Sequence, residues 1–145
     1  MKKTHIIFTL FLAVILVTSC STSFNDIDDN HSDVIGFTLS VNLELPLSSN
    51  NPEINFPLPY FVSNATSSER TFRVVVVEEE TELAEESYSF DAEVIIPANE
   101  RSGTLVFTAL NISLTNEYVP LVLAFESTSE IASGNRMNIF LKTND

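Results

Sequence analysis

The feature that most constrains the fold is a period of two in hydrophobicity that begins after Gly36. Successive side chains of a β-strand point to opposite faces of a sheet, so strict alternation is typical of a strand with one buried and one solvated face. Pro46 and the polar segment 48–52 end the pattern. The apolar positions are Phe37, Leu39, Val41, Leu43 and Leu45, and the polar ones between them are Thr38, Ser40, Asn42 and Glu44.

Six further short apolar segments follow, separated by polar or turn residues, and none has a convincing helical period. They span residues 56–62, 72–77, 92–97, 104–110, 119–125 and 137–141. This spacing predicts an all-β domain, a single immunoglobulin-like sandwich of about seven strands, with a small barrel as the alternative. The chain has 11 Phe, one Cys and no Trp. The core must therefore consist of Phe, Leu, Val and Ile, without a disulfide.

Two of these segments carry more specific information. Residues 72–77 are apolar and β-branched on both faces, which favours a central strand with neighbours on each side. Residues 56–62 contain Pro57 and Pro59, which remove two amide donors along the same edge. We expect that edge to be unpaired or covered by a loop.

The first twenty residues have the anatomy of a secretory signal peptide. A short basic start, Met1-Lys2-Lys3, precedes the apolar segment 6–17, which is too short for a permanent membrane-spanning helix. An ordinary cleaved signal is one interpretation. A lone exported Cys20, however, has no partner within the chain. Val17-Thr18-Ser19-Cys20 resembles the bacterial lipobox, which implies a signal peptide over 1–19 and lipidation, including palmitate, at Cys20.

The residues after Cys20 predict where the protein is placed. Residues 20–34 are polar, acidic and without period, as expected of a flexible tether before a sandwich domain at 35–145. By resemblance to the sorting rules of Gram-negative lipoproteins, Ser21 favours the outer membrane. Asp26, Asp28 and Asp29 are similar to the acidic stretch that accompanies export to the cell surface.

Composition limits the chemistry. After removal of residues 1–19, 126 residues remain with five basic and 20 acidic side chains, a net charge of −15. So acidic a chain repels nucleic acid. His31 is then the only histidine and Cys20 the only cysteine, so neither a nucleophilic triad nor a zinc site can be assembled. A hydrolase that uses only carboxylates would need a cleft, and we expect the protein not to be an enzyme.

The most acidic segment offers a possible metal site. Eight carboxylates lie between Glu78 and Glu93, and a hard cation such as calcium would relieve their repulsion. The weak calcium candidates are Glu80, Glu82 and Asp91. Alternatively the segment is a solvated loop or a single helical turn that guards a sheet edge. No cofactor other than calcium is indicated.

The three tyrosines permit a second hypothesis. Tyr60, Tyr88 and Tyr118 could form a platform on which sugar rings stack, although each also fits a core position at the end of a strand.

Three stretches together resemble the Calx-beta family: 84–88, 94–100 and 103–108. The resemblance implies a Calx-beta-like sandwich on an exported protein. Asn99 stands where the family has Gly, so a positive φ is expected there. Tyr88 is expected to be half-buried. The family's calcium-ligand positions correspond to Ser87 and to Leu110-Asn111, which argues against calcium.

These observations predict a non-catalytic cell-envelope lipoprotein whose sandwich is a binding or structural module. The alternatives are a calcium-stabilised surface adhesion domain and a surface glycan-binding protein. The expected partners are the membrane, through the lipid, and a protein or glycan; no nucleic acid is expected.

Overall fold

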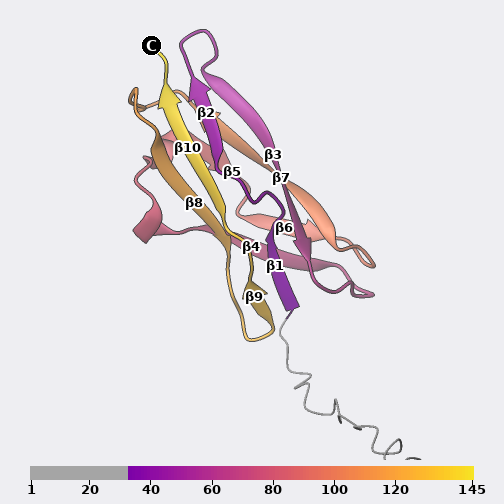
Figure 1. Cartoon of the computed structure of the whole chain (residues 1–145). Coiled ribbons are helices and arrows are strands. Elements are labelled where there is room, and N and C mark those ends of the chain that lie inside the picture. Colours follow the sequence, from indigo (N-terminus) through magenta and orange to yellow (C-terminus); the bar gives the residue numbers. More distant parts are fainter. Residues whose placement is uncertain (1–32) are drawn as a thin grey trace, which may run out of the picture. The chain divides into compact units, whose positions relative to one another are not determined.

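The computed structural model describes residues 33–145, which form one compact unit with its own core (Figure 1). The predicted signal peptide, Cys20 and nearly all of the predicted tether lie outside the described residues. Within residues 33–145, no helix has the length and hydrophobicity needed to cross a membrane.

The unit is a sandwich of two five-stranded sheets. Sheet A has the order β5-β7-β3-β1-β9, and sheet B has the order β2-β10-β8-β4-β6. The pairs β1–β9 and β2–β10 are parallel, and the other pairs are antiparallel. The strands are β1 (Asp33–Phe37), β2 (Leu43–Leu47), β3 (Glu53–Val62), β4 (Arg70–Val76), β5 (Tyr88–Phe90), β6 (Glu93–Ile96), β7 (Ser102–Leu110), β8 (Val119–Phe125), β9 (Ile131–Ser133) and β10 (Met137–Thr143).

The all-β sandwich is confirmed, but the predicted number of seven strands is wrong, because the described residues form ten. The alternating segment 36–45 forms two strands, β1 in sheet A and β2 in sheet B. Alternation shows which side chains are buried and not which neighbour a strand pairs with. Since both sheets bury their apolar face in the same core, the alternation gives no sign that the chain changes sheets. Strands β5 and β9 have three residues each and were missed.

The core lies between the two sheets and is purely apolar apart from Ser87. Phe37 and Tyr60 of sheet A contact Phe125 of sheet B, with ring centroids 5.0 Å and 5.5 Å apart. Each large apolar side chain that is fully buried stabilises the fold by about 1.5–3 kcal/mol. Other fully buried side chains are Ile35, Leu47, Leu58, Val62, Ile96, Phe107, Leu121, Leu123, Met137, Ile139 and Leu141.

Both expectations for individual strands are confirmed. Strand β4 has β6 on one side and β8 on the other, as a central strand should. Strand β3 pairs with β7 over Glu53–Phe61 but with β1 only over Tyr60–Val62. The carbonyl of Pro59 accepts a hydrogen bond from the N–H of Thr38, so the proline edge faces β1. In the described residues, the ladder between β1 and β3 stops where the prolines begin.

The acidic segment forms a loop with two short 3-10 turns, η1 (Glu78–Glu80) and η2 (Glu85–Ser87). This agrees with the expectation of a loop or a single helical turn. All residues of η1 are exposed. A hydrogen bond from the backbone and, second to it, a hydrogen bond of 2.8 Å that the Ser113 hydroxyl donates both lower the pKa of the Glu86 carboxyl.

The connecting loops gather at two ends of the sandwich (Figure 1). At one end Asp33, where β1 begins, donates its N–H to the carbonyl of Glu130 at 3.0 Å, and Asn99 donates to Thr66 at 2.7 Å. At the other end the Asp145 carboxylate accepts hydrogen bonds from Ser49, at 2.9 Å, and from Asn111, at 3.0 Å. We call the first the Asp33 end.

Candidate functional site

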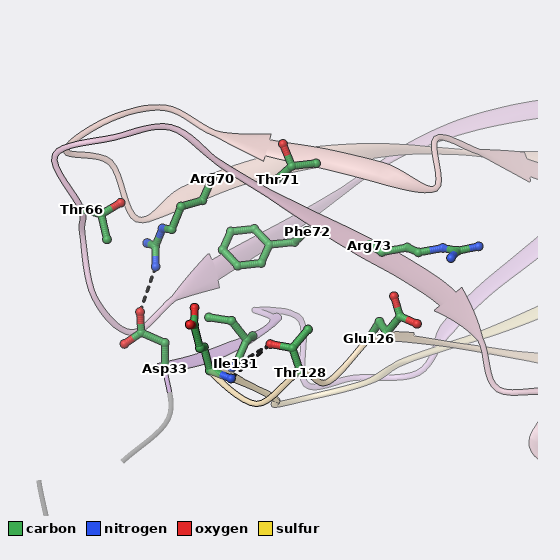
Figure 2. Close-up of a pocket in the computed structure, with 10 residues that line it drawn as sticks. Asp33, Thr66, Arg70, Thr71, Phe72, Arg73, Glu126, Thr128 and Ile131 are labelled. Atoms are coloured by element: carbon green, nitrogen blue, oxygen red, sulfur yellow. Dashed lines mark hydrogen bonds and ion pairs between the residues drawn. The ribbon is translucent and has the colours of Figure 1, made fainter. Parts of the chain in front are cut away.

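The Asp33 end contains a hollow of about 460 Å³, which we call the Arg70 hollow (Figure 2). Strand β4 forms one wall, and the segment that joins β8 to β9 forms the other. The residues that line it are Asp33, Thr66, Arg70, Thr71, Phe72, Arg73, Glu126, Thr128, Glu130 and Ile131.

The floor of the Arg70 hollow is apolar. Phe72 is 8% exposed and belongs to the core, and Ile131 packs against the same core. In Figure 2 both side chains lie between the two walls. Because the alternation of β4 buries Phe72, it leaves Thr71 and Arg73 exposed.

One wall is fixed by Arg70. A terminal nitrogen of its guanidinium lies 2.9 Å from Oδ2 of Asp33, and these side chains are only 16% and 20% exposed. Its other terminal nitrogen donates to the carbonyl of Asn64, whose side-chain amide donates to Asp33. The guanidinium carbon lies 5.4 Å from the centroid of the Phe72 ring, a cation–π contact. The Arg70 Nε is buried without a hydrogen-bond partner.

The opposite wall is fixed by Thr128. Its hydroxyl oxygen accepts hydrogen bonds from the N–H groups of Glu130, at 3.3 Å, and Ile131, at 3.2 Å. Its N–H donates to the carbonyl of Ile131 at 2.8 Å. The N–H of Glu126 donates to the carbonyl of Arg73 at 2.9 Å, which ties the two walls together. The rim is therefore held largely by its backbone, and among its exposed side chains the Thr66 hydroxyl donates a hydrogen bond of 2.7 Å to the carbonyl of Ser68.

The rim offers both kinds of hydrogen-bonding group. Arg73 is a donor, Glu126 and Glu130 are acceptors, and the hydroxyls of Thr66 and Thr71 are both. No histidine or cysteine is among the lining residues. Such a site can hold a small ligand that carries several hydroxyl groups.

A second hollow, of about 500 Å³, lies beside the segment between β1 and β2. An ion pair between Arg136 and Glu80 contributes to its wall, with both side chains half exposed. Exposed pairs of this kind stabilise proteins by about 0–1 kcal/mol.

The structure does not bring the calcium candidates together. Glu80 pairs with Arg136, the N–H of Glu82 donates to the carbonyl of Pro120, and Asp91 lies between β5 and β6. Among residues 33–145 no three His, Cys, Asp or Glu side chains form a group that could hold a metal ion. The calcium hypothesis therefore gains no converging ligands from this part of the chain.

The hypothesis of a tyrosine platform is wrong. Tyr60 is 2% exposed and packs on Phe125 inside the sandwich, so it cannot stack on a ligand. This burial also raises the pKa of its hydroxyl. Tyr118, in contrast, is exposed, with the Lys142 ammonium 4.8 Å from its ring centroid.

The local expectations that came from the Calx-beta resemblance are confirmed. Asn99 has a φ of 65°. Tyr88 is half-buried and stacks with Phe90 and Phe107. Ser87, at one of the family's calcium-ligand positions, is completely buried and donates a hydrogen bond of 2.6 Å to the carbonyl of Ile112.

The Arg70 hollow was not predicted from the sequence. Its residues come from four separate stretches, around 33, 66, 70–73 and 126–131, and they form no motif. The only signal in the sequence is the pair of arginines beside the predicted central strand, Arg70 just before it and Arg73 within it.

Comparisons with known proteins identify the fold but not a family. No family model matches the chain, and no curated protein matches it. A protein of unknown function from Bacteroides ovatus has a TM-score of 0.60 at 15% identity, over 75% of this chain and 44% of that one.

A candidate carbohydrate-binding protein from the same organism has a TM-score of 0.57 at 15% identity, over 74% of this chain and 36% of that one. The chain thus spans less than half the length of these two Bacteroides proteins. The CBD1 domain of Calx has a TM-score of 0.53 at 11% identity, over 79% of this chain and 100% of the domain. The domain is a Calx-beta-like β-sandwich.

Proposed function

We propose that this chain is a non-catalytic lipoprotein of the bacterial cell envelope and that its Arg70 hollow binds a carbohydrate. The observation that carries the proposal is the lining of the hollow, which combines charged and hydroxyl residues with the apolar side chains of Phe72 and Ile131. The volume of about 460 Å³ lies in the range of about 300–1,000 Å³ that is usual for small-molecule sites.

The chemistry of the rim supports this ligand class. A sugar hydroxyl donates one hydrogen bond and accepts others, so it is satisfied by a site that has both arginine and carboxylate groups. Arg73 and Glu126 provide these groups at neighbouring positions of the lining, where the N–H of Glu126 donates to the carbonyl of Arg73. Likeness to the candidate carbohydrate-binding protein of Bacteroides ovatus agrees with the proposal, although at 15% identity that likeness concerns the fold.

The proposed location in the cell envelope rests on the first twenty residues. The basic start, the apolar segment 6–17 and the lipobox-like Val17-Thr18-Ser19-Cys20 support export, cleavage and lipidation. Several acyl chains on Cys20 would anchor the protein stably without a spanning helix. Ser21 and the acidic residues that follow support the outer membrane and its outer surface.

The proposed ligand class is tested by probing a glycan array with the domain 32–145. The affinity of any glycan that binds is then measured by calorimetry. Arg73→Ala and Glu126→Ala should each weaken binding by at least about tenfold, since a hydrogen bond to a charged group is worth about 1.5–3 kcal/mol. Arg136→Ala, which removes a charge from the second hollow, is the matched control and should leave binding unchanged. An empty array, or a glycan whose affinity ignores Arg73 and Glu126, would contradict the proposal.

The anchor is tested separately in the full-length chain. A clickable palmitate analogue fed to expressing cells should label the wild type but not Cys20→Ser, and the wild type should sediment with the outer membrane. Ser19→Thr, which leaves the cysteine in place, is the control. Equal labelling of the wild type and Cys20→Ser would exclude lipidation at this residue.

A further inference from the structure

The outer face of sheet A exposes apolar side chains that the core does not use. Val106 on β7 is 56% exposed, Phe61 on β3 is 41% exposed and Val34 on β1 is 37% exposed. Their neighbours along each strand are buried, for example Leu105 and Phe107 beside Val106. Alternation therefore points these three side chains away from the core, where a sheet of a monomer normally carries polar residues.

The register joins these residues into one stripe. Val106 lies opposite Pro57, which is followed on the same face of β3 by Pro59 and then Phe61. Phe61 lies opposite Gly36 on β1, which is buried against the backbone of Gly134 and Asn135, and Val34 is the preceding outward residue of that strand. Val34 lies opposite Ala132 on β9. We call the surface formed by Val34, Pro57, Pro59, Phe61, Val106 and Ala132 the neutral face.

The neutral face is free of charge. The five strands of sheet A contain only two charged residues, Asp33 and Glu53, and each is the first residue of its strand. Of the other outward positions on β3 and β7, Glu53 at the start of β3 is charged, whereas Asn55, Ser102, Thr104, Thr108 and Leu110 are neutral. This contrasts with the net charge of −13 on the chain.

We infer that the neutral face binds a second copy of this chain, so that two sandwiches pack through their A sheets. Two copies of so acidic a protein repel each other, and apolar contact is favourable only where it brings no carboxylates together. The neutral face meets this condition. A basic partner would instead be attracted to the acidic loop at 78–86, since the neutral face offers it no charge. A two-fold pairing also places the same apolar stripe on both sides of the contact.

The size of the face predicts a weak dimer. With strands about 4.8 Å apart and about 3.4 Å per residue, the five strands cover roughly 500 Å². A standard stable interface buries about 800 Å² per partner. We therefore expect a weak dimer with a dissociation constant of about 100 µM, which forms only where the local protein concentration is high.

The test is sedimentation velocity of the domain 32–145 over concentrations up to about 1 mM, well above the expected dissociation constant. The wild type should shift from monomer to dimer. Val106→Glu and Phe61→Glu should each weaken self-association at least about tenfold, because each places like charges across the interface. Ile95→Glu, at a residue of sheet B that is 51% exposed, is the matched control and should dimerise like the wild type. Circular dichroism verifies that every variant is folded.

Two variants of opposite charge distinguish binding to a second copy of this chain from binding to another partner. Val106→Glu and Val106→Lys should each be monomeric alone, and a mixture of the two should regain the dimer. A wild type that stays monomeric to about 1 mM, or a dimer that none of the neutral-face variants weakens, would overturn the inference. Arg73→Ala should leave the dimer intact, so this result is independent of ligand binding in the Arg70 hollow.

Discussion

Gly103 makes room for the side chain that joins the two sheets. It lies opposite Tyr60 in the β3–β7 pair, on the face that is turned to the core. The Tyr60 ring crosses above it, packs on Phe125, and its hydroxyl donates a long hydrogen bond of 3.4 Å to the carbonyl of Ile95 in sheet B. A Cβ at position 103 would lie 2.8 Å from Cε2 of the ring and closer still to Cζ and the hydroxyl oxygen.

We therefore predict that Gly103→Ala lowers the free energy of unfolding by about 1–3 kcal/mol, the usual cost of overpacking a core. The Tyr60 ring is only 2% exposed and packs on Phe125, so a shift would disturb the core. Urea unfolding measures the change. Thr104→Ala, at the exposed neighbouring position, should change the stability by no more than about 0.5 kcal/mol. Equal effects at the two positions would mean that Tyr60 can shift without cost.

At this scale the sequence predicted local geometry better than it predicted side-chain roles. The positive φ of Asn99 was implied by the Calx-beta resemblance, in which Asn99 stands where the family has Gly, and Asn tolerates that conformation. The burial of Tyr60 was harder to predict, because an aromatic residue near the end of a strand fits either the core or a ligand-binding surface. Only the register opposite Gly103 shows that it faces inward.

At the scale of elements, the Asp33–Arg70 ion pair connects β1 in sheet A to β4 in sheet B. It combines charge with low exposure, and Arg70 donates a further hydrogen bond to Asn64. A charged hydrogen bond of this kind is worth more than a pair in open solvent.

A double-mutant cycle with Asp33→Asn and Arg70→Gln should give a coupling energy of about 1–2 kcal/mol, measured by urea unfolding. The same cycle with Glu80→Gln and Arg136→Gln is the control. That pair is half exposed, so its coupling should stay below about 0.5 kcal/mol. If both cycles gave the same small value, the Asp33–Arg70 pair would not fasten the sheets.

Most strands were predicted to within a few residues, because a half-buried strand leaves an alternating pattern. The pattern could not show where the chain changes sheets, so β1 and β2 were merged. Asp33 and Val34, assigned from the sequence to the tether, belong to β1, where polar Asp33 pairs with Arg70. The short strands β5 and β9 are held by pairing with β7 and β1, which no local pattern reveals.

At the scale of the whole molecule, the fold was more predictable than the site. Apolar periodicity predicts strands that each bury one face, and two packed sheets satisfy this requirement. The Arg70 hollow instead depends on four stretches that meet only after folding. The neutral face likewise depends on the register of β7, β3, β1 and β9, since Val106, Phe61 and Val34 are unremarkable until they lie side by side.

The position of Asp33 has a mechanical consequence. This residue is where the chain enters the domain, and it also lines the Arg70 hollow. A pull between a ligand in the hollow and the residues that precede Asp33 would travel through β1, β4 and their ion pair. The force would therefore act only on the Asp33 end of the sandwich and not on its other end. Strand β1 has neighbours on both sides, β3 and β9, so a load along its axis would shear several hydrogen bonds together instead of peeling them one at a time.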